Sequence, residues 1–266
     1  MSDTFTLAGV GLHSGVRSRV TLHREDGPVR LVTRGRTVRP VLGEVASTSF
    51  CTTLGRDDVR IGTVEHLLAA LHAHGVWSGL TVEVDGDELP ILDGSAEPWS
   101  ELIGEMQAQE AFPPPPPAVA GSAHARNDAG GVATVEPGED ALEVSIEFDH
   151  PAIGHQAVSV MPDARVDVLS ARTFGFLADA ERMLAAGYSK GAGPESVILF
   201  DDMSAIAPLR FPDEPVRHKA LDALGDLYLL GAPIAGRIRV HRGGHALHVA
   251  LAAALSSEAL SSEAHA

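Results

Sequence analysis

Cysteine is nearly absent from this chain of 266 residues, with Cys51 as the only one. A single cysteine excludes a disulfide within the chain and nearly excludes a zinc site built from thiolates. Cys51 also has no histidine signature beside it, so we expect a buried small residue rather than a nucleophile.

Long apolar runs are missing as well. No window approaches the ~20 apolar residues of a membrane-spanning helix, and the longest soft run, 246–255, contains His248. The N-terminus does not show the basic segment and apolar stretch of a signal peptide. These absences predict a cytoplasmic protein without a transmembrane segment.

Positive charge is scarce too, and the formal net charge is −16. This balance argues against binding of nucleic acid or of an anionic membrane through a broad basic face. Only Lys190 and Lys219 are lysines among the 20 basic residues. Where a chain otherwise uses arginine, a lysine indicates that a compact, flexible ammonium group is needed, with chance placement as the alternative.

The proline run from Pro113 to Pro117 divides the chain near its middle. Consecutive prolines cannot form a helix interior or a central strand, and they favour a stiff polyproline II spacer. We therefore predict a first domain over residues 1–112, a linker over 113–117 and a second domain over 118–255. The polar residues 256–266 are expected to be disordered.

Apolar periodicity predicts strands and about two helices in each half of the chain. Helix 63–74 is expected to have Thr63 as its N-cap and Gly75 as its stop. No repeat is visible by sequence identity, but the two halves could share one architecture. The expected strands are 16–22, 81–84, 142–148, 158–160, 197–200 and 238–240, and the other expected helices are 98–107, 177–186, 214–230 and one from about 245.

Two separated fragments carry residue types that bind metals. One contains Glu65 and His66, and the other places His218 and Asp222 four residues apart on the longest expected helix. Residues four apart lie one turn apart on one helix face, so the pair can hold one ion. With a third ligand from elsewhere, two histidines and one carboxylate form the ligand set of a catalytic zinc. Glu65 is then a candidate for the base that acts on water.

Each fragment also has a plain structural interpretation. The polar stripe of the long helix can be a solvated face, and Glu65 can simply favour the positive end of its helix. His245, in a glycine-rich turn, favours a functional site over these structural roles, because a carboxylate such as Asp226 can orient its ring. His72 and His74 are expected to be surface residues, since no other residue pairs with them in the sequence pattern.

Two further segments carry less information. The glycine-rich segment 9–15 lacks the Lys-Ser/Thr pair of a phosphate-binding loop and the dinucleotide-binding spacing, so a nucleotide loop is rejected there. The hydroxyl and aromatic side chains of segment 170–176 can line a site or belong to the core.

Seven segments match a known family in the same order. Together they closely resemble the UDP-3-O-acyl-N-acetylglucosamine deacetylases, the zinc amidases of lipid A biosynthesis. The resemblance extends from about residue 7 to 255, and the order of the motifs makes it specific. The segments are GVGLHSG (9–15), TVEHLLAAL (63–71), ILDGSAEPW (91–99), EFDHPAI (147–153), ARTFGF (171–176), FPDEPVRHKALDALGDLYLLG (211–231) and GHAL (244–247).

The resemblance implies an α+β fold of two similar domains. Each would be a β-sheet layered with two α-helices, and the domains would face each other across the active site. A βαβ insert over about 173–200 would form an acyl passage. The implied activity is zinc-dependent hydrolysis of the N-acetyl group of a UDP-3-O-acyl-N-acetylglucosamine, with release of acetate in the committed step of lipid A biosynthesis. The implied partner is a small UDP-sugar that bears an acyl chain, and we expect a monomer.

The resemblance also implies roles for single residues. Zinc would be held by His66, His218 and Asp222, although this ligand set also suits Fe2+. The base and the acid would be different residues, as hydrolysis of an amide requires. The implied roles are Glu65 as general base, His245 as general acid, Asp226 as the residue that steadies His245, Thr173 as oxyanion donor, Lys219 and Phe174 as substrate contacts, Phe148 as the aromatic against the nucleotide base and Asp179 as a nearby polar contact.

One stretch departs from the family pattern, at Gly191 to Ser196, where relatives usually carry Gly-Gly-Ser followed by Asn. Because it lies in the insert, it bears on acyl-chain length and substrate binding rather than on the metal and acid–base residues. Two alternatives stay open: a zinc amidase for another acylated amino sugar, and a catalytically silent sugar-nucleotide-binding or regulatory protein. The complete set of metal and acid–base residues argues against silence.

Overall fold

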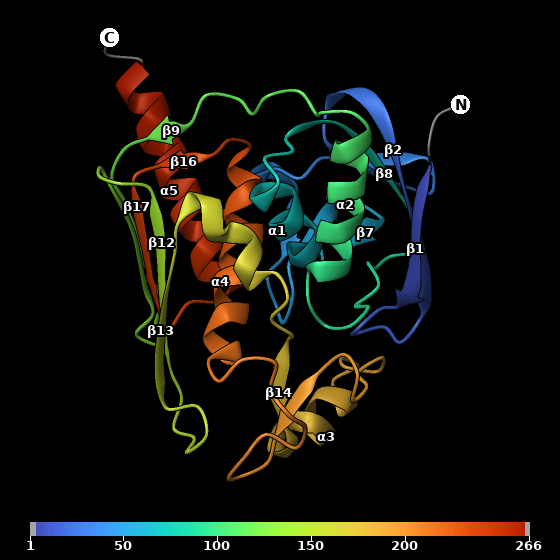
Figure 1. Cartoon of the computed structure of the whole chain (residues 1–266), viewed down its shortest axis with the longest axis vertical. Coiled ribbons are helices and arrows are strands. Elements are labelled where there is room, and N and C mark those ends of the chain that lie inside the picture. The colour runs from blue at the N-terminus through green and yellow to red at the C-terminus, as the bar shows by residue number, and fades with distance from the viewer. Residues whose placement is uncertain (1–3, 264–266) are drawn as a thin grey trace.

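The computed structural model describes residues 4–263, and two five-stranded β-sheets frame the molecule (Figure 1). The first sheet contains, in spatial order, β1 (Phe5–Val10), β2 (Arg17–Pro28), β8 (Ser78–Asp85), β3 (Arg30–Thr33) and β4 (Arg36–Val38). The second contains β10 (Ala123–Arg126), β11 (Val132–Glu136), β17 (Arg237–His241), β12 (Ala141–Glu147) and β13 (His155–Val160).

The two sheets have the same strand order and the same strand directions. In each, the central strand is the last one in sequence, and it pairs antiparallel with one neighbour and parallel with the other. Alternating apolar residues set the register, so that Leu22 pairs with Val82 in the first sheet and Leu142 with Ile238 in the second. The expectation of one shared architecture is therefore confirmed by topology, although sequence identity does not reveal it.

Between the two sheets, each half contributes two helices, one before and one after the central strand of its sheet. The first half has α1 (Glu65–Ala73) and α2 (Glu97–Gln109), and the second has α4 (Glu214–Leu227) and α5 (His245–Glu263). These helices lie between the two sheets, and α1 packs on α4 at the centre (Figure 1). The chain is thus an α+β protein made of two similar sheet-and-helix units, as the resemblance implies.

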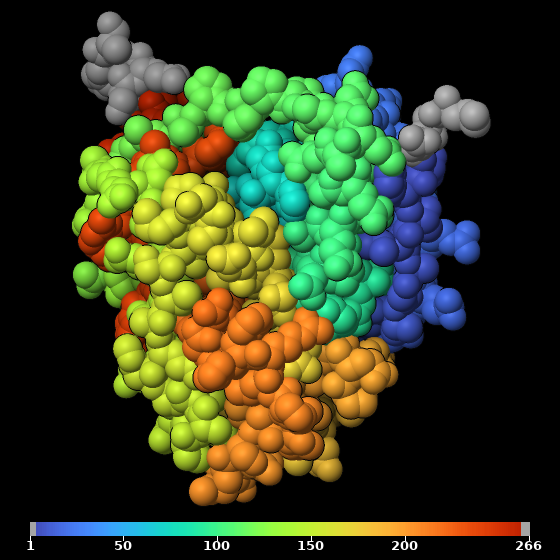
Figure 2. Space-filling model, in the orientation of Figure 1, coloured from blue at the N-terminus to red at the C-terminus, as the bar shows by residue number. Residues whose placement is uncertain are grey.

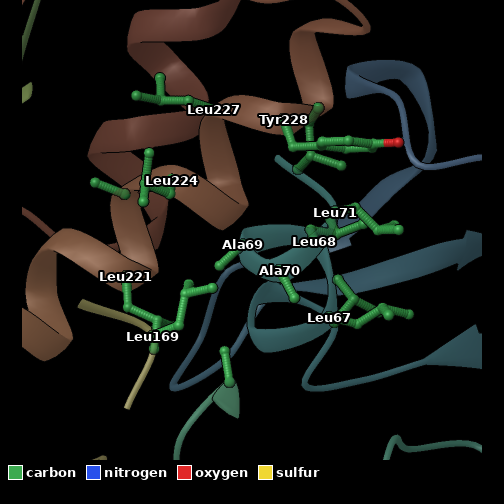
Figure 3. Close-up of a cluster of buried hydrophobic side chains, with 14 of the residues drawn as sticks. Leu67, Leu68, Ala69, Ala70, Leu71, Leu169, Leu221, Leu224, Leu227 and Tyr228 are labelled. Atoms are coloured by element: carbon green, nitrogen blue, oxygen red, sulfur yellow. The ribbon is translucent and has the colours of Figure 1, made fainter. Parts of the chain in front are cut away.

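The contact between α1 and α4 is the apolar centre of the molecule (Figure 3). Residues 65–72 of α1 are all buried, which is typical of a helix surrounded by protein. Tyr228 closes one end of the contact, where its ring stacks on Trp77 at 4.2 Å and its hydroxyl donates to the carbonyl of Val76. Figure 3 draws buried apolar side chains of both helices, with Ala69 on the side of α1 that faces α4 and with Leu67 and Leu71 on the opposite side.

Each half also inserts a small unit before its first helix. In the second half, β14 (Phe174–Phe176) and β15 (Ile198–Phe200) pair in parallel across α3 (Leu177–Ala185), which forms the expected βαβ insert. Figure 2 shows this insert in gold at one end of the molecule. The first half inserts the antiparallel strands β5 (Val45–Ser47), β6 (Thr53–Arg56) and β7 (Val59–Ile61).

The proline run at 113–117 forms neither helix nor strand and joins α2 to β9 (Val119–Ala120). The remaining elements are β16 (Ile234–Ala235), which pairs with β9, and the short 3₁₀ helices η1 (Leu42–Glu44), η2 (Pro162–Val168) and η3 (Tyr228–Leu230). Among the helices in residues 4–263, none combines the length and apolar character that crossing a bilayer requires.

Two local expectations are corrected by the structure. Residues 256–263 continue helix α5 instead of forming a disordered tail, because Leu255 is buried and Glu258 accepts a hydrogen bond from the backbone N–H of Ser122. Residues 264–266 of that expected tail lie outside the described residues. Thr63 is not the N-cap of α1, since the helix begins at Glu65 and the Thr63 hydroxyl donates to Glu88.

Candidate active site

Three side chains from the two central helices converge where α1 meets α4. His66 comes from α1, and His218 and Asp222 come from α4. One ligand-type atom from each lies within 4.8 Å of the other two, and all three residues are at most 4% exposed. The structure thus brings together the three residues expected from the sequence, and we call them the metal trio.

Backbone carbonyl groups orient both histidine rings of the trio. His66 Nδ1 lies 3.2 Å from the carbonyl oxygen of Ser95, and His218 Nδ1 lies 3.0 Å from that of Ala171. Because a carbonyl oxygen only accepts hydrogen bonds, each Nδ1 carries the proton and each Nε2 keeps its lone pair. Burial lowers the pKa of both rings, that of His218 to about 4, against the opposing charge of Asp222. Neutral imidazole is the form that binds metals.

An ion-pair network spans the two halves and anchors the loops that carry these carbonyl groups. Arg210 binds Asp93 at 2.8 Å, and Asp93 accepts hydrogen bonds from Ser95. On the other side, the buried Glu214 binds Arg172 at 2.9 Å and accepts the backbone N–H of Arg210. Arg210 therefore ties the segment behind one histidine of the trio to the segment behind the other.

Asp222 uses one oxygen for the trio and the other for Lys219. Its Oδ1 lies 3.3 Å from His218 Nε2, while its Oδ2 accepts a hydrogen bond of 2.8 Å from Lys219 Nζ. Burial raises the pKa of Asp222, but Lys219 and His218 outweigh this and hold it well below its usual range. The long side chain of Lys219 thus reaches a residue of the metal trio three positions later on α4.

These donors fit a catalytic zinc ion. Two neutral imidazole nitrogens and one carboxylate oxygen are a known protein ligand set for zinc that keeps a position open for chemistry. The outer partners also fit, since metal-binding histidines usually donate their second N–H to a carbonyl or a carboxylate.

Glu65 and His245 face each other beside the trio. His245 Nε2 lies 3.9 Å from Glu65 Oε1, and Glu65 is 3% exposed. Burial raises the pKa of Glu65 to about 8; His245 opposes the rise, and the carboxylates of Asp226 and Asp222 add to it. Burial lowers the pKa of His245, but Asp226 and Glu65 outweigh it and raise the pKa to about 10. A carboxyl group with a raised pKa suits a base, and an imidazolium suits an acid.

Asp226 connects to His245 from the side away from Glu65. Its Oδ2 lies 2.9 Å from His245 Nδ1 and 2.8 Å from His248 Nδ1, and its Oδ1 lies 2.5 Å from the hydroxyl of Thr52. Burial raises the pKa of Asp226, but the two histidines lower it to about 2. Asp226, His245 and His248 are also metal-binding residue types in one cluster. Because both Nδ1 atoms lie at hydrogen-bond distance from one oxygen, we interpret this cluster as a network of N–H donors to Asp226.

The other four expected site residues lie toward the insert. Thr173 is half-buried just before β14, and its backbone N–H donates to the carbonyl of Gly94. The Phe174 ring lies 6.4 Å from the ring of His218 and 5.7 Å from the ring of Phe148. Phe148 and Asp179 both line a cavity of about 300 Å³ at the base of the insert. Aromatic rings therefore connect the metal trio to that cavity.

Comparisons with known proteins identify the family of this chain. The family model described as UDP-3-O-acyl N-acetylglycosamine deacetylase matches residues 1–257. This chain belongs to that family. A UDP-3-O-acyl-N-acetylglucosamine deacetylase of Myxococcus xanthus is 42% identical over 260 residues, covering 93% of this chain and 82% of the relative.

Two further deacetylases of the same name extend the comparison. The one from Anaeromyxobacter dehalogenans is 40% identical and covers 91% of this chain and 82% of its own length. The one from Brucella melitensis biotype 1 is 36% identical, and the match covers 95% of this chain and 93% of the relative. The deacetylase family is a family of metalloenzymes, and the metal trio is a group able to hold an ion.

Several residues of this site were missed by sequence reasoning. Gly225 is one that the sequence could have revealed. A glycine inside a long helix lowers the stability of the helix, so its presence indicates that another backbone approaches it closely. His248 follows His245 by one helical turn, which a search of the helix face would find. Thr52 carried no signal, since its hydroxyl meets a carboxylate 174 positions away. His72, expected on the surface, is buried, and its Nδ1 donates to the carbonyl of Leu224.

Proposed function

We propose that this chain hydrolyses the N-acetyl group of UDP-3-O-acyl-N-acetylglucosamine with a bound zinc ion and releases acetate. One observation carries the proposal: His66, His218 and Asp222 converge beside the facing pair of Glu65 and His245. Membership of the deacetylase family supports the same substrate class.

The residues of the site divide the work of amide hydrolysis. Bound zinc supplies a Lewis acid that polarises the amide carbonyl and makes water easier to deprotonate. Glu65 takes a proton from the attacking water, whose oxygen bonds to the acetyl carbon. His245 then donates its Nε2 proton to the departing nitrogen as the carbon–nitrogen bond breaks. The products are acetate and the free amine of the sugar.

The substrate contacts in this proposal follow the arrangement of the insert. Thr173 would donate to the oxyanion, and Phe174 and Lys219 would border the sugar. Phe148 and Asp179 would hold the nucleotide base in the cavity that they line, and the βαβ insert would form the passage for the acyl chain. The role in lipid A biosynthesis follows from membership of the deacetylase family, whereas a cytoplasmic location and a monomeric state stay predictions.

Acetate release from defined substrates tests the proposal. We expect turnover of UDP-3-O-acyl-N-acetylglucosamine, much slower turnover of UDP-N-acetylglucosamine without the acyl chain, and none by Asp222→Ala. Turnover of a different acylated amino sugar in preference to the UDP-sugar would favour the wider amidase. Binding of the UDP-sugar without any acetate release from metal-loaded protein would favour the silent binding protein. Reconstitution with Zn2+ and with Fe2+ in parallel separates the two metals.

A further inference from the structure

Thr52 contacts both sides of the acid–base pair with different groups. Its backbone N–H donates to Glu65 Oε2 at 3.0 Å, and its hydroxyl donates to Asp226 Oδ1 at 2.5 Å. Its carbonyl accepts the backbone N–H of Val64, just before α1. Thr52 is fully buried. One residue from the loop between β5 and β6 thus holds a carboxylate on α1 and another on α4.

The hydroxyl of Thr52 decides which oxygen Asp226 offers to His245. With Oδ1 bound to the hydroxyl, Oδ2 is the oxygen that faces the Nδ1 atoms of His245 and His248. A carboxylate free to rotate about its terminal bond would exchange its two oxygens, because that torsion is broad. His248 cannot prevent this alone, since it binds the same oxygen as His245 and lies on the same helix.

We infer that Thr52 is a positioning residue that fixes the general base and the general acid relative to each other. Its backbone N–H holds Glu65, and its hydroxyl holds His245 through Asp226. The inference rests on the proposed function, because it assigns acid and base as that function does. It adds that the acid is oriented from the first half of the chain, although His245 and Asp226 both belong to the second half.

Replacing the Thr52 hydroxyl while keeping the backbone N–H removes the hydrogen bond to Asp226 and leaves the one to Glu65 in place. Thr52→Val has nearly the same shape, and we expect its kcat to fall ~10- to 100-fold, the scale of one hydrogen bond to a charged group. KM and zinc content should stay near the wild-type values, and Thr52→Ser should recover most of the loss. Thr53→Val is the matched control, because within residues 4–263 the hydrogen bond of the Thr53 hydroxyl is to the sulfur of Cys51 and not to a residue of the site.

A double-mutant cycle separates positioning from general stability. If Thr52 acts through Asp226 and His245, Thr52→Val should cost little in the His245→Ala background. Equal losses in the two backgrounds, or a loss confined to KM, would overturn the inference. If Thr52→Val does not fold, Thr52→Ala takes its place in the cycle.

A second readout does not depend on turnover. In protein labelled with ¹⁵N-histidine, the Nδ1 protons of His245 and His248 should exchange with solvent at least ~10-fold faster in Thr52→Val than in wild type or Thr53→Val, because loss of one hydrogen bond to the carboxylate frees its rotation. Unchanged exchange would overturn the inference even if the enzyme is active. If wild-type protein releases no acetate, the proposed function fails, while the exchange measurement still decides whether Thr52 holds Asp226.

Discussion

Gly225 of α4 lies directly against the backbone of Glu65 at the start of α1: a Cβ atom at Gly225 would stand 2.1 Å from the carbonyl oxygen of Glu65. Only a residue without a side chain allows the two helices to approach so closely. The approach matters because α1 carries Glu65 and His66, whereas α4 carries the other two residues of the metal trio.

The first prediction concerns this crossing. Gly225→Ala should lower the free energy of unfolding by about 1–3 kcal/mol through overpacking and should weaken zinc binding, because the trio is pushed apart. Gly104→Ala is the control: Gly104 also lies inside a helix, but its added Cβ would meet His74 at an ordinary 3.6 Å. It should be neutral or slightly stabilising. Denaturant unfolding and zinc titration of both variants test this prediction. Equal free energies of unfolding and equal zinc affinities in the two variants would contradict it.

Much of this arrangement could be predicted from sequence because it is encoded locally. The spacing of His218 and Asp222 is a helix-face pattern, and strand alternation marked strands of both sheets. The contacts that shape the site are not local: Gly225 meets Glu65, and Thr52 meets Asp226, across more than half of the chain. No periodicity reports which backbone approaches a glycine or which hydroxyl meets a carboxylate.

The second prediction concerns the acid and the base. Glu65→Gln and His245→Gln should each lower kcat by ~10²–10⁴-fold while zinc content stays at the wild-type level, because neither residue belongs to the trio. Single-turnover acetate release and metal analysis on the same samples provide the measurement. Near-wild-type turnover in either variant would remove that residue from its role.

The third prediction concerns Lys219, whose ammonium group donates to Asp222 of the metal trio. Lys219→Met should weaken zinc binding by ~10-fold, as loss of an outer partner of a ligand usually does, and should also raise KM. Lys190→Met, which removes the other lysine from an exposed position, should leave zinc affinity unchanged. Unchanged zinc affinity in Lys219→Met together with a raised KM would mean that Lys219 serves only the substrate.

The fourth prediction concerns the pH dependence of stability. Burial, with a smaller contribution from Arg165, lowers the pKa of His72 from 6.5 to about 4. Between these values the unfolded chain binds a proton that the folded chain does not, so stability falls as pH decreases from about 6.5 to about 4. A shift of this size corresponds to about 3 kcal/mol.

The variant His72→Asn removes this titration and keeps a side-chain N–H for the Leu224 carbonyl. Its free energy of unfolding should therefore decline less than that of the wild type between pH 7 and pH 4, by up to about 3 kcal/mol. Urea unfolding of both proteins across this range provides the comparison, in which the other titrating groups cancel. Parallel curves would show that His72 does not titrate as its burial implies.

The account rests on a metal held by His66, His218 and Asp222 and used for amide hydrolysis. Its most direct test is to remove the metal with a chelator and titrate zinc back while acetate release from UDP-3-O-acyl-N-acetylglucosamine is recorded. We predict that activity returns in proportion to zinc and levels off at one ion per chain, and that Asp222→Ala neither holds that ion tightly nor regains activity. Full acetate release by the metal-free wild type, or by Asp222→Ala, would contradict the account.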